Sequence, residues 1–539
     1  MFTQYKKRNW KIFISIILAL ILSFFFMMGN RIDFSGEIHS KYYDTTIRGL
    51  QFTDGVIFIA LFVVLFGLFS FLVRVVANKK VISKFIGTAR NFSKKEIVKW
   101  TILIALACWI CWSPYFLAFY PGSVMGDSFK SIREIMGINA FTNHHPILYT
   151  LLIGFFVKLG NVFWNYNFGV FLYVLFQSTI MAMTVGRLIV WLHEHGIKKW
   201  FCVLSILFFA VLPVFPAYAM ILWKDPLFSC AMLWYMMILC DLVLTKGEKL
   251  KSTAYIIRFL VAMLLIMILR NNGTYIIFPT VFCLAIIYRK ILKTKWLLIF
   301  AFIIGYSLVN GMVLNALHIK TEFVESVGIP LQQMTRVVVE DGKMTKADKE
   351  FLFHLLPEDE YKKSYQPALV DSIKWNPEFD EEYLEEHKGE FFKTWLNMLK
   401  NNFSIYVDAY CLNTFGFWMP GVQTDYGYAD RRIQEKNNVF NIHQVDVVER
   451  FFGFSLREKL QGNMIFIGSG TLAWIMLIIS ALLFMIKRNA FVPVLPILFN
   501  WGIYLVASPA AFGLRYVFIL LFGLPLLIVL PFMFMKNEK

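Results

Sequence analysis

The sequence predicts an all-α, polytopic membrane protein. Of its 539 residues, 58% are hydrophobic and 17% are aromatic, and the mean hydropathy is +0.59. A soluble protein of this length does not carry so many apolar runs of about 20 residues, which is the length that crosses a bilayer as a helix. Basic residues gather in the short segments between these runs, as they do in the cytoplasmic loops of membrane proteins.

The charges are divided unequally along the chain. Residues 317–463 contain 24 acidic and 17 basic residues, whereas the rest of the chain contains 12 acidic and 36 basic residues. A net charge of +17 would suit a nucleic-acid-binding protein, but the basic residues lie in loops between apolar runs. We therefore expect a lipid bilayer, and no nucleic acid, as the partner of these basic segments.

The first apolar run follows the basic flank Lys6–Lys11. No small-residue cleavage site follows it, so we expect a spanning helix with a cytoplasmic N-terminus, and a cleaved signal peptide is the alternative. Residues 74–99 contain eight basic residues and one acidic residue, which places this segment in the cytoplasm. Continued in this way, the pattern predicts a multi-pass protein of the cell membrane with twelve spans and both termini in the cytoplasm. The spans are expected at about 12–28, 53–75, 100–119, 167–192, 200–222, 227–245, 254–270, 274–288, 296–316, 463–486, 491–507 and 515–535.

Three regions follow from this topology. Residues 1–316 form an N-terminal transmembrane module whose external loop, 120–166, contains a short juxtamembrane helix after Pro146. Residues 317–462 form a small, mostly helical extracytoplasmic domain, and residues 463–539 form a C-terminal transmembrane module. Within the domain we expect a strand or turn at "VGIPLQQMTRVVV" and a helix that starts at Thr345, because Thr-x-x-Asp is typical of a helix N-terminus.

The same topology brings several ionisable and polar residues to the external face. Ionisable groups near a membrane are costly, and they often mark a functional site. They are Asp127, His144, His145, Lys224, Asp225, Arg270, Asn271, Asn272 and Arg515.

Asp127 follows a turn and precedes a short helical pattern. It can serve as an N-cap, where the helix dipole favours a carboxylate, or as a general base that takes a proton from a hydroxyl group. His144 and His145 are poor joint metal ligands, because adjacent residues on one helix point about 100° apart. We expect one of them to donate a hydrogen bond to a phosphate or sugar, and His145 could also cap the helix after Pro146.

Cations come from three further segments. Lys224, beside Asp225, and Arg270, beside Asn271, can be explained by helix ends and interfacial lysines alone. Arg515 precedes a helix, where the dipole does not favour a cation, so it indicates an anionic partner such as a phosphate. A carboxylate with several cations suits transfer from a lipid phosphate, since the carboxylate deprotonates the incoming hydroxyl and the cations stabilise the departing phosphate. The sequence contains no nucleotide-binding P-loop or G-x-G-x-x-G pattern.

The segments "YPGSVMGDS", "NHHPILYTLLIG", "WKDPLF", "LRNNG" and "GIPLQQMTRVV" resemble the GT-C superfamily of integral-membrane glycosyltransferases. More closely, they resemble an uncharacterised group of bacterial polytopic proteins near that superfamily. The resemblance implies an inverting transfer of a sugar from a polyprenyl-phosphate-linked donor to a cell-surface glycan or glycolipid acceptor, at the extracytoplasmic face. It implies Asp127 as the catalytic base and Asp225 as a second acidic position. His144, His145, Lys224, Arg270, Asn271 and Arg515 are the expected substrate and phosphate ligands.

The chain departs from the best-known members of the superfamily in two ways. No second acidic residue accompanies Asp127 in an Asp-x-Asp or Asp-Glu pair, which weakens any requirement for a metal ion. We therefore expect no cofactor, and a divalent metal ion is the alternative. The soluble domain lies between the ninth and tenth spans rather than after the last span. Two other functions fit the same composition, namely a transporter or flippase of a lipid-linked saccharide and a non-catalytic subunit of cell-envelope polysaccharide assembly. A transporter predicts polar groups near the membrane midplane and inverted repeats, whereas the polar groups here gather on one face.

Overall fold

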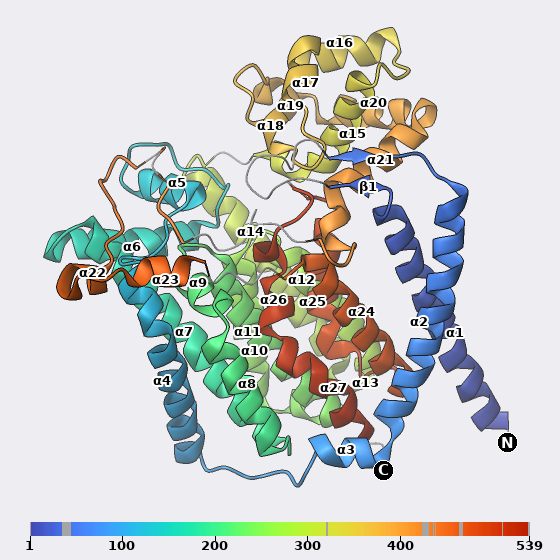
Figure 1. Cartoon of the computed structure of the whole chain (residues 1–539), viewed down its shortest axis with the longest axis vertical. Helices are drawn as coiled ribbons and strands as arrows, with labels where there is room; N and C mark the ends of the chain where they lie inside the picture. Colours follow the sequence, from blue (N-terminus) through green and yellow to red (C-terminus); the bar gives the residue numbers. More distant parts are fainter. Residues whose placement is uncertain are drawn as a thin grey trace.

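The protein is almost entirely helical (Figure 1). The computed structural model describes residues 2–34, 45–319, 322–422, 431–434, 436, 438–462, 467–508 and 510–536. In the N-terminal module the elements are α1 (Phe2–Gly29), β1 (Ile32–Asp33), β2 (Thr46–Ile47), α2 (Phe52–Ala77), α3 (Lys79–Phe85), α4 (Lys94–Ala118), α5 (Gly126–Ile135), α6 (Ile147–Phe163), α7 (Tyr166–Glu194), α8 (Lys199–Val211), α9 (Val214–Met220), α10 (Asp225–Leu244), η1 (Glu248–Lys251), α11 (Thr253–Leu269), α12 (Gly273–Ile287), α13 (Arg289–Leu292), η2 (Lys293–Lys295) and α14 (Trp296–Ala316).

The remaining elements form the outer domain and the C-terminal module. They are η3 (Phe323–Ser326), α15 (Gly328–Val339), α16 (Lys346–Leu355), α17 (Glu358–Ser364), α18 (Asp371–Lys374), α19 (Glu381–Glu386), α20 (Lys388–Asn401), α21 (Phe403–Thr414), η4 (Phe415–Phe417), α22 (Val447–Phe452), α23 (Leu456–Gln461), α24 (Ser469–Ile486), η5 (Val492–Val494), α25 (Leu495–Tyr504), η6 (Leu514–Val517), α26 (Phe518–Phe522) and α27 (Leu524–Lys536).

Seven helices in the described part of the chain are long and apolar enough to cross a membrane, and the number rises to nine if each of two bent helix pairs is one span. The pairs are α8 with α9, bent by 56°, and the helix of residues 514–522 with α27, bent by 44°. The twelve predicted spans all fall on apolar helices, but α11, α12 and the helix of residues 492–504 are shorter than the 18 residues that this length criterion requires. By length and composition, the described residues therefore contain seven to nine candidate spans rather than the twelve expected, and the fold is consistent with a helical membrane protein.

The burial of the spanning helices follows their place in the bundle. In α10, 83% of the most apolar window is buried inside the protein, whereas the corresponding share is 11% in α2 and 17% in α14. Apolar side chains on α2 and α14 that no other part of the protein covers are those that a lipid environment accommodates. The bundle therefore has a central helix, α10, and peripheral helices that face outward.

The juxtamembrane helix expected after Pro146 is α6, which packs along α7 beside α5 (Figure 1). The contact is close because Gly160 of α6 faces Gly169 of α7, and a Cβ atom at Gly160 would collide with the backbone of Gly169. This contact holds the C-terminal end of α6 against the start of α7.

The outer domain has a hydrophobic core of its own between Val324 and Tyr406. Its helix α16 begins where predicted, since the Thr345 side chain accepts a hydrogen bond from the backbone of Asp348 in a capping box. The strand or turn expected just before it is wrong, because residues 328–339 form the helix α15, whose apolar face lies in that core. The Arg31 guanidinium donates a 3.0 Å hydrogen bond to Asp408 and ties the domain to the end of α1.

The region predicted as one domain, 317–462, has two parts. Beyond α21 the chain returns to the main core, which includes Phe415 and Ile442, and α22 and α23 pack against α4. The outer domain and α3 lie at opposite ends of the bundle, and both chain ends lie at the α3 end (Figure 1).

Candidate functional site

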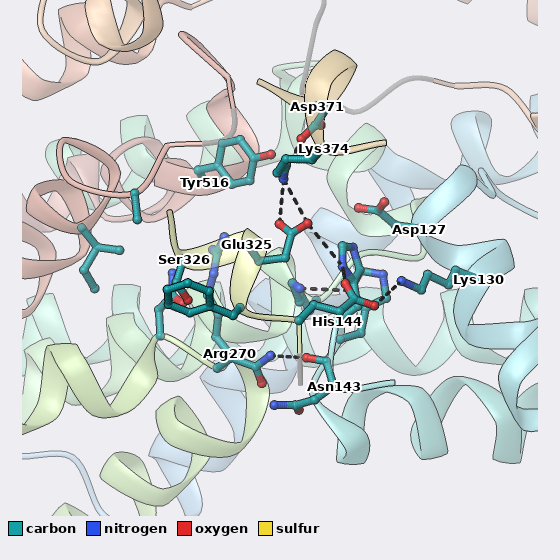
Figure 2. A pocket seen from close by; sticks show the side chains of 18 of the residues that line it. Asp127, Lys130, Asn143, His144, Arg270, Glu325, Ser326, Asp371, Lys374 and Tyr516 are labelled. Atoms are coloured by element: carbon teal, nitrogen blue, oxygen red, sulfur yellow. Dashed lines mark hydrogen bonds and ion pairs between the residues drawn. The ribbon is translucent and has the colours of Figure 1, made fainter. Parts of the chain in front are cut away.

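A cavity of about 1200 Å³ lies between the helical bundle and the outer domain (Figure 2). All eight residues predicted for the site line it: Asp127, His144, His145, Lys224, Asp225, Arg270, Asn271 and Arg515. They come from the first turn of α5, from the loop before α6, from the start of α10, from the end of α11 and from η6. The structure thus brings together residues that are as far as 388 positions apart in the chain.

Backbone hydrogen bonds fix the segment just before α5, the helix that carries Asp127. The amide of Ser123 donates to the carbonyl oxygen of Met220, and the amide of Leu222 donates to the carbonyl oxygen of Ser123. The hydroxyl of Ser128 also donates to the carbonyl oxygen of Leu222. The start of α5 is therefore joined to the segment just before Lys224.

Asp127 lies in the first turn of α5, as expected, but the N-cap position is occupied by Met125. Its Oδ2 atom accepts a 2.8 Å hydrogen bond from Nη1 of Arg515, and its side chain is 37% exposed toward the cavity. Burial raises the pKa of Asp127, but the positive charges of Arg515 and the neighbouring side chains outweigh burial and hold this pKa well below its usual range. Asp127 is therefore an ionised hydrogen-bond acceptor at neutral pH.

Arg515 is held by aromatic rings as well as by Asp127. Its guanidinium lies 5.0 Å from the ring centre of Trp223 and 4.7 Å from that of Tyr516, and its Nη2 atom donates a 2.9 Å hydrogen bond to the Tyr516 hydroxyl. Such contacts with aromatic faces stabilise a cation that is partly removed from water. They fix the direction in which Arg515 faces the cavity.

Lys224 and His145 form the second contact of the site. The Nζ atom of Lys224 lies 3.0 Å from Nδ1 of His145. Burial, together with the charge of Lys224, lowers the pKa of His145 well below its usual value, so the imidazole is neutral. Nδ1 then accepts the hydrogen bond and Nε2 carries the proton, and Nε2 is buried without a hydrogen-bond partner among the described residues. Burial and the nearby Arg270 lower the pKa of Lys224 to about 8.

Arg270 and Asp225 form an ion pair at the base of the cavity. Nη1 of Arg270 donates a 2.7 Å hydrogen bond to Asp225, and the two side chains are only 6% and 3% exposed. The guanidinium also lies over the rings of Tyr504 and Tyr516. The ring of Tyr516 therefore contacts the guanidinium groups of both Arg270 and Arg515.

The outer wall of the cavity contains residues that the sequence did not suggest (Figure 2). Glu322 accepts hydrogen bonds from His144 at 2.8 Å and from Lys130 at 3.1 Å, and Glu325 accepts one of 3.0 Å from Lys374. Lys130 lies one helical turn after Asp127, a spacing that could have identified it. The residues from the outer domain reach the site only through docking of that domain, so no local pattern announces them.

Asn271 and His145 have local contacts near the loop before α6. Asn271 donates a 2.8 Å hydrogen bond to the carbonyl oxygen of Asn143, so it secures the histidine loop. His145 is not the cap of α6, because the N-cap is Pro146.

His144 and His145 do not lie on one helix, so the prediction that they are poor joint metal ligands rested on the wrong geometry. They lie in a turn before α6, and potential ligand atoms of Asp127, His144 and His145 lie within 4.8 Å of one another. A second group of this kind comprises His144, Glu322 and Glu325. However, Arg515 and Lys224 contact Oδ2 of Asp127 and Nδ1 of His145, and their positive charges oppose the approach of a divalent cation. The cations beside these donor atoms therefore favour an anionic ligand over a metal ion.

Comparison with known proteins gives a family and no activity. No curated protein matches the chain, and no solved structure matches it. A family described as being of unknown function, DUF6020, matches residues 136–539, which include His144, Lys224, Arg270 and Arg515 and leave out Asp127. Because this match covers most of the chain, the protein belongs to the DUF6020 family.

Proposed function

We propose that the protein is a membrane glycosyltransferase that transfers a sugar from a polyprenyl-phosphate donor to a cell-surface glycan or glycolipid. The observation that supports this most directly is the convergence of the Asp127 carboxylate with Lys224, Arg270 and Arg515 on one cavity. A carboxylate beside several cations suits a reaction in which a hydroxyl loses a proton while a phosphate leaves. The resemblance to the GT-C superfamily is part of the same proposal.

The reaction can be written with the residues in place. Asp127 takes the proton of an acceptor hydroxyl, and the oxygen attacks the anomeric carbon of the donor sugar. The new carbon–oxygen bond forms as the bond between the anomeric carbon and the phosphate oxygen breaks, which inverts the anomeric centre. The polyprenyl phosphate leaves with the bonding electrons, and the charges of Arg515 and Lys224 stabilise it. No step requires a cofactor.

The donor's apolar chain needs a route from the membrane to the cavity. Tyr275 of α12 and Val506, just after α25, line the cavity, and each is 71% exposed. Tyr275 lies in the first turn of α12, Val506 follows the end of α25, and both helices are apolar. This side of the cavity therefore offers apolar surface beside the membrane. An exposed apolar edge of this kind favours a lipid-linked donor over a free nucleotide sugar.

The proposed topology has twelve spans, cytoplasmic termini and an extracytoplasmic cavity. The basic segment 74–99 and the ends of the chain lie at the end of the bundle opposite the outer domain, which agrees with a cytoplasmic location for that end (Figure 1). In this arrangement the short helices α11 and α12 meet beside Arg270 at the floor of the cavity, so they need not traverse the full bilayer thickness.

Asp225 acts in this proposal through Arg270. Its carboxylate is 3% exposed and is engaged by Arg270, so it holds a phosphate ligand in place rather than touching the acceptor.

The alternative function, a transporter of a lipid-linked saccharide, would place charged groups along a path through the membrane. The charged residues named here instead gather on one cavity, which the outer domain borders.

Genetic complementation combined with lipid analysis tests the proposal. A deletion strain is expected to accumulate a polyprenyl-phosphate sugar, and the wild-type gene should remove it. Asp127→Asn should fail to remove it although the variant is expressed and folded, because the amide cannot accept the proton. Asp408→Asn breaks an Arg–Asp pair outside the cavity and should complement. Complementation by Asp127→Asn would refute Asp127 as the base.

A further inference from the structure

Asp127 and Arg515 form an ion pair in the cavity, although the proposed reaction needs each of them for a different partner. The base must contact the acceptor hydroxyl, and the guanidinium must contact the donor phosphate. We propose that a substrate phosphate displaces Asp127 from Arg515, and that this exchange makes the carboxylate available as the base. The catalytic consequence rests on the proposed function, whereas the exchange itself is a property of anion binding.

The geometry of Arg515 permits such an exchange. Nη1 contacts Oδ2 of Asp127, whereas Nη2 is held by the Tyr516 hydroxyl, and the planar group lies over Trp223. Arg515 therefore keeps its aromatic contacts and its bond to Tyr516 when Nη1 changes partner. A guanidinium binds phosphate oxygens in the same manner as carboxylate oxygens, so the incoming group replaces the carboxylate at equivalent distances.

The other guanidinium of the cavity is not suited to this exchange. Arg270 is paired with Asp225, and both side chains are nearly completely buried, so separating them would leave a carboxylate without water or a partner. Asp127, in contrast, is 37% exposed to the cavity, and water or an acceptor hydroxyl can solvate it after Arg515 leaves. Lys224 contacts the neutral His145 instead of a carboxylate, so it can add its charge to the phosphate without breaking an ion pair.

The exchange gives the reaction an order. While Arg515 holds Asp127, the carboxylate has a low proton affinity and is a poor base. A phosphate bound to Arg515 neutralises the guanidinium and brings negative charge near the carboxylate, which raises its proton affinity. The base therefore becomes effective once the donor is bound, so the donor precedes the acceptor.

Phosphate binding to the full-length protein in nanodiscs tests the exchange without any sugar transfer. Isothermal titration calorimetry would compare inorganic phosphate and geranyl phosphate as probes. Asp127→Asn should bind the probe about tenfold more tightly than the wild type, because Arg515 no longer has to leave a carboxylate. Arg515→Gln should bind the probe more weakly than the wild type. The double variant Asp127→Asn with Arg515→Gln should have the same affinity as Arg515→Gln alone.

The double variant separates the exchange from a general charge effect. Loss of one negative charge would favour an anion in both backgrounds, whereas the exchange predicts a gain only when Arg515 is present. Arg515→Lys serves as a second background if Arg515→Gln does not fold, and the gain there should be intermediate because an ammonium does not stack on Trp223 as the planar guanidinium does. Asp408→Asn, which breaks the Arg31 pair outside the cavity, should leave the affinity unchanged.

The outcomes discriminate between the two proposals. A gain for geranyl phosphate alone identifies a lipid headgroup as the ligand, and a gain for both probes identifies the phosphate group itself; either supports the exchange. Unchanged or weaker binding in Asp127→Asn, an equal gain in both backgrounds, or no binding to the wild type overturns it. If the gain is observed but deletion strains accumulate no polyprenyl-phosphate sugar, the exchange stands and the transferase proposal fails.

Discussion

The carboxylate of Asp225 accepts a 2.7 Å hydrogen bond from Arg270 in an environment where the two side chains are 3% and 6% exposed. A buried ion pair loses most when one partner is removed, because the other charge is then left without compensation. We predict that Asp225→Asn lowers the free energy of unfolding by about 3 kcal/mol. Thermal unfolding of the purified protein would measure this.

Two further variants test the same explanation. Asp341→Asn breaks the exposed pair with Lys362 and should change the stability by less than about 1 kcal/mol. Combining Asp225→Asn with Arg270→Met removes both charges and should restore part of the stability lost in the single variant. If the double variant is less stable than Asp225→Asn, the penalty does not come from an uncompensated Arg270.

Lys224 gives the site a predicted pH dependence. Burial and the charge of Arg270 lower its pKa to about 8, so the ammonium that attracts an anion is present below this pH and is lost above it. A phosphate monoester is fully ionised above about pH 7, so the charge of the ligand does not change in this range. The affinity for geranyl phosphate should therefore be constant to about pH 8 and then fall by up to about tenfold per pH unit.

Lys224→Arg is the matched variant for this prediction, because a guanidinium remains charged throughout the range. Its affinity for geranyl phosphate should not fall between pH 8 and about pH 10. Parallel curves for the wild type and this variant would assign the pH dependence to another group.

Glu322 is predicted to hold the outer domain against the loop that carries His144. It accepts hydrogen bonds from both His144 and Lys130, and Glu322→Gln should weaken this junction. Hydrogen–deuterium exchange should become faster in residues 322–326 and 142–146, while the interior of α16 is unaffected. Glu358→Gln, which changes an exposed pair with Lys362, is the control and should alter neither segment.

The same junction should respond to acid. Burial opposes ionisation of Glu322, but the hydrogen bond from His144 and the charge of Lys130 lower its pKa to about 2 from an ordinary value of 4.5. A lowered pKa means that the stabilising contribution is complete above about pH 4.5 and is lost as the pH falls toward 2. Exchange that is insensitive to pH across this interval would contradict the assignment.

Chelation should leave sugar transfer and phosphate binding intact. Arg515 and Lys224 supply positive charge to the cavity, and they contact Oδ2 of Asp127 and Nδ1 of His145. We expect unchanged activity in membranes treated with EDTA. Loss of activity that Mg²⁺ or Mn²⁺ restores would show that the protein requires a metal ion.

Much of the fold could be predicted because apolar length and loop charge are local properties of the sequence. The span predicted at 296–316 coincides with α14, and that at 53–75 lies within α2. The bend between α8 and α9 could not be predicted from hydropathy, because an apolar run reads alike whether its helix is continuous or broken, although Pro213 lies at the break.

The site could be predicted to the extent that ionisable residues interrupt apolar segments. Lys224, Asp225 and Arg270 lie at the ends of apolar helices, and Asp127 lies in the first turn of the short helix α5. Which residues pair with which is a tertiary property, so the partners of Asp127 and His144 could not be inferred. The prediction that both histidines lie on one helix was wrong for a related reason, since they belong to a turn before α6 whose shape depends on tertiary packing.

The bond between Asp127 and Arg515 joins residues 388 positions apart, and its second partner lies in the last tenth of the protein. Because synthesis starts at the N-terminus, the ribosome makes Asp127 long before it makes Arg515. Premature termination or failed insertion of the last helices would leave a cavity without Arg515. Insertion of the final membrane segments is therefore a late step of biogenesis, and the cavity lacks the positive charge of Arg515 until that step is finished.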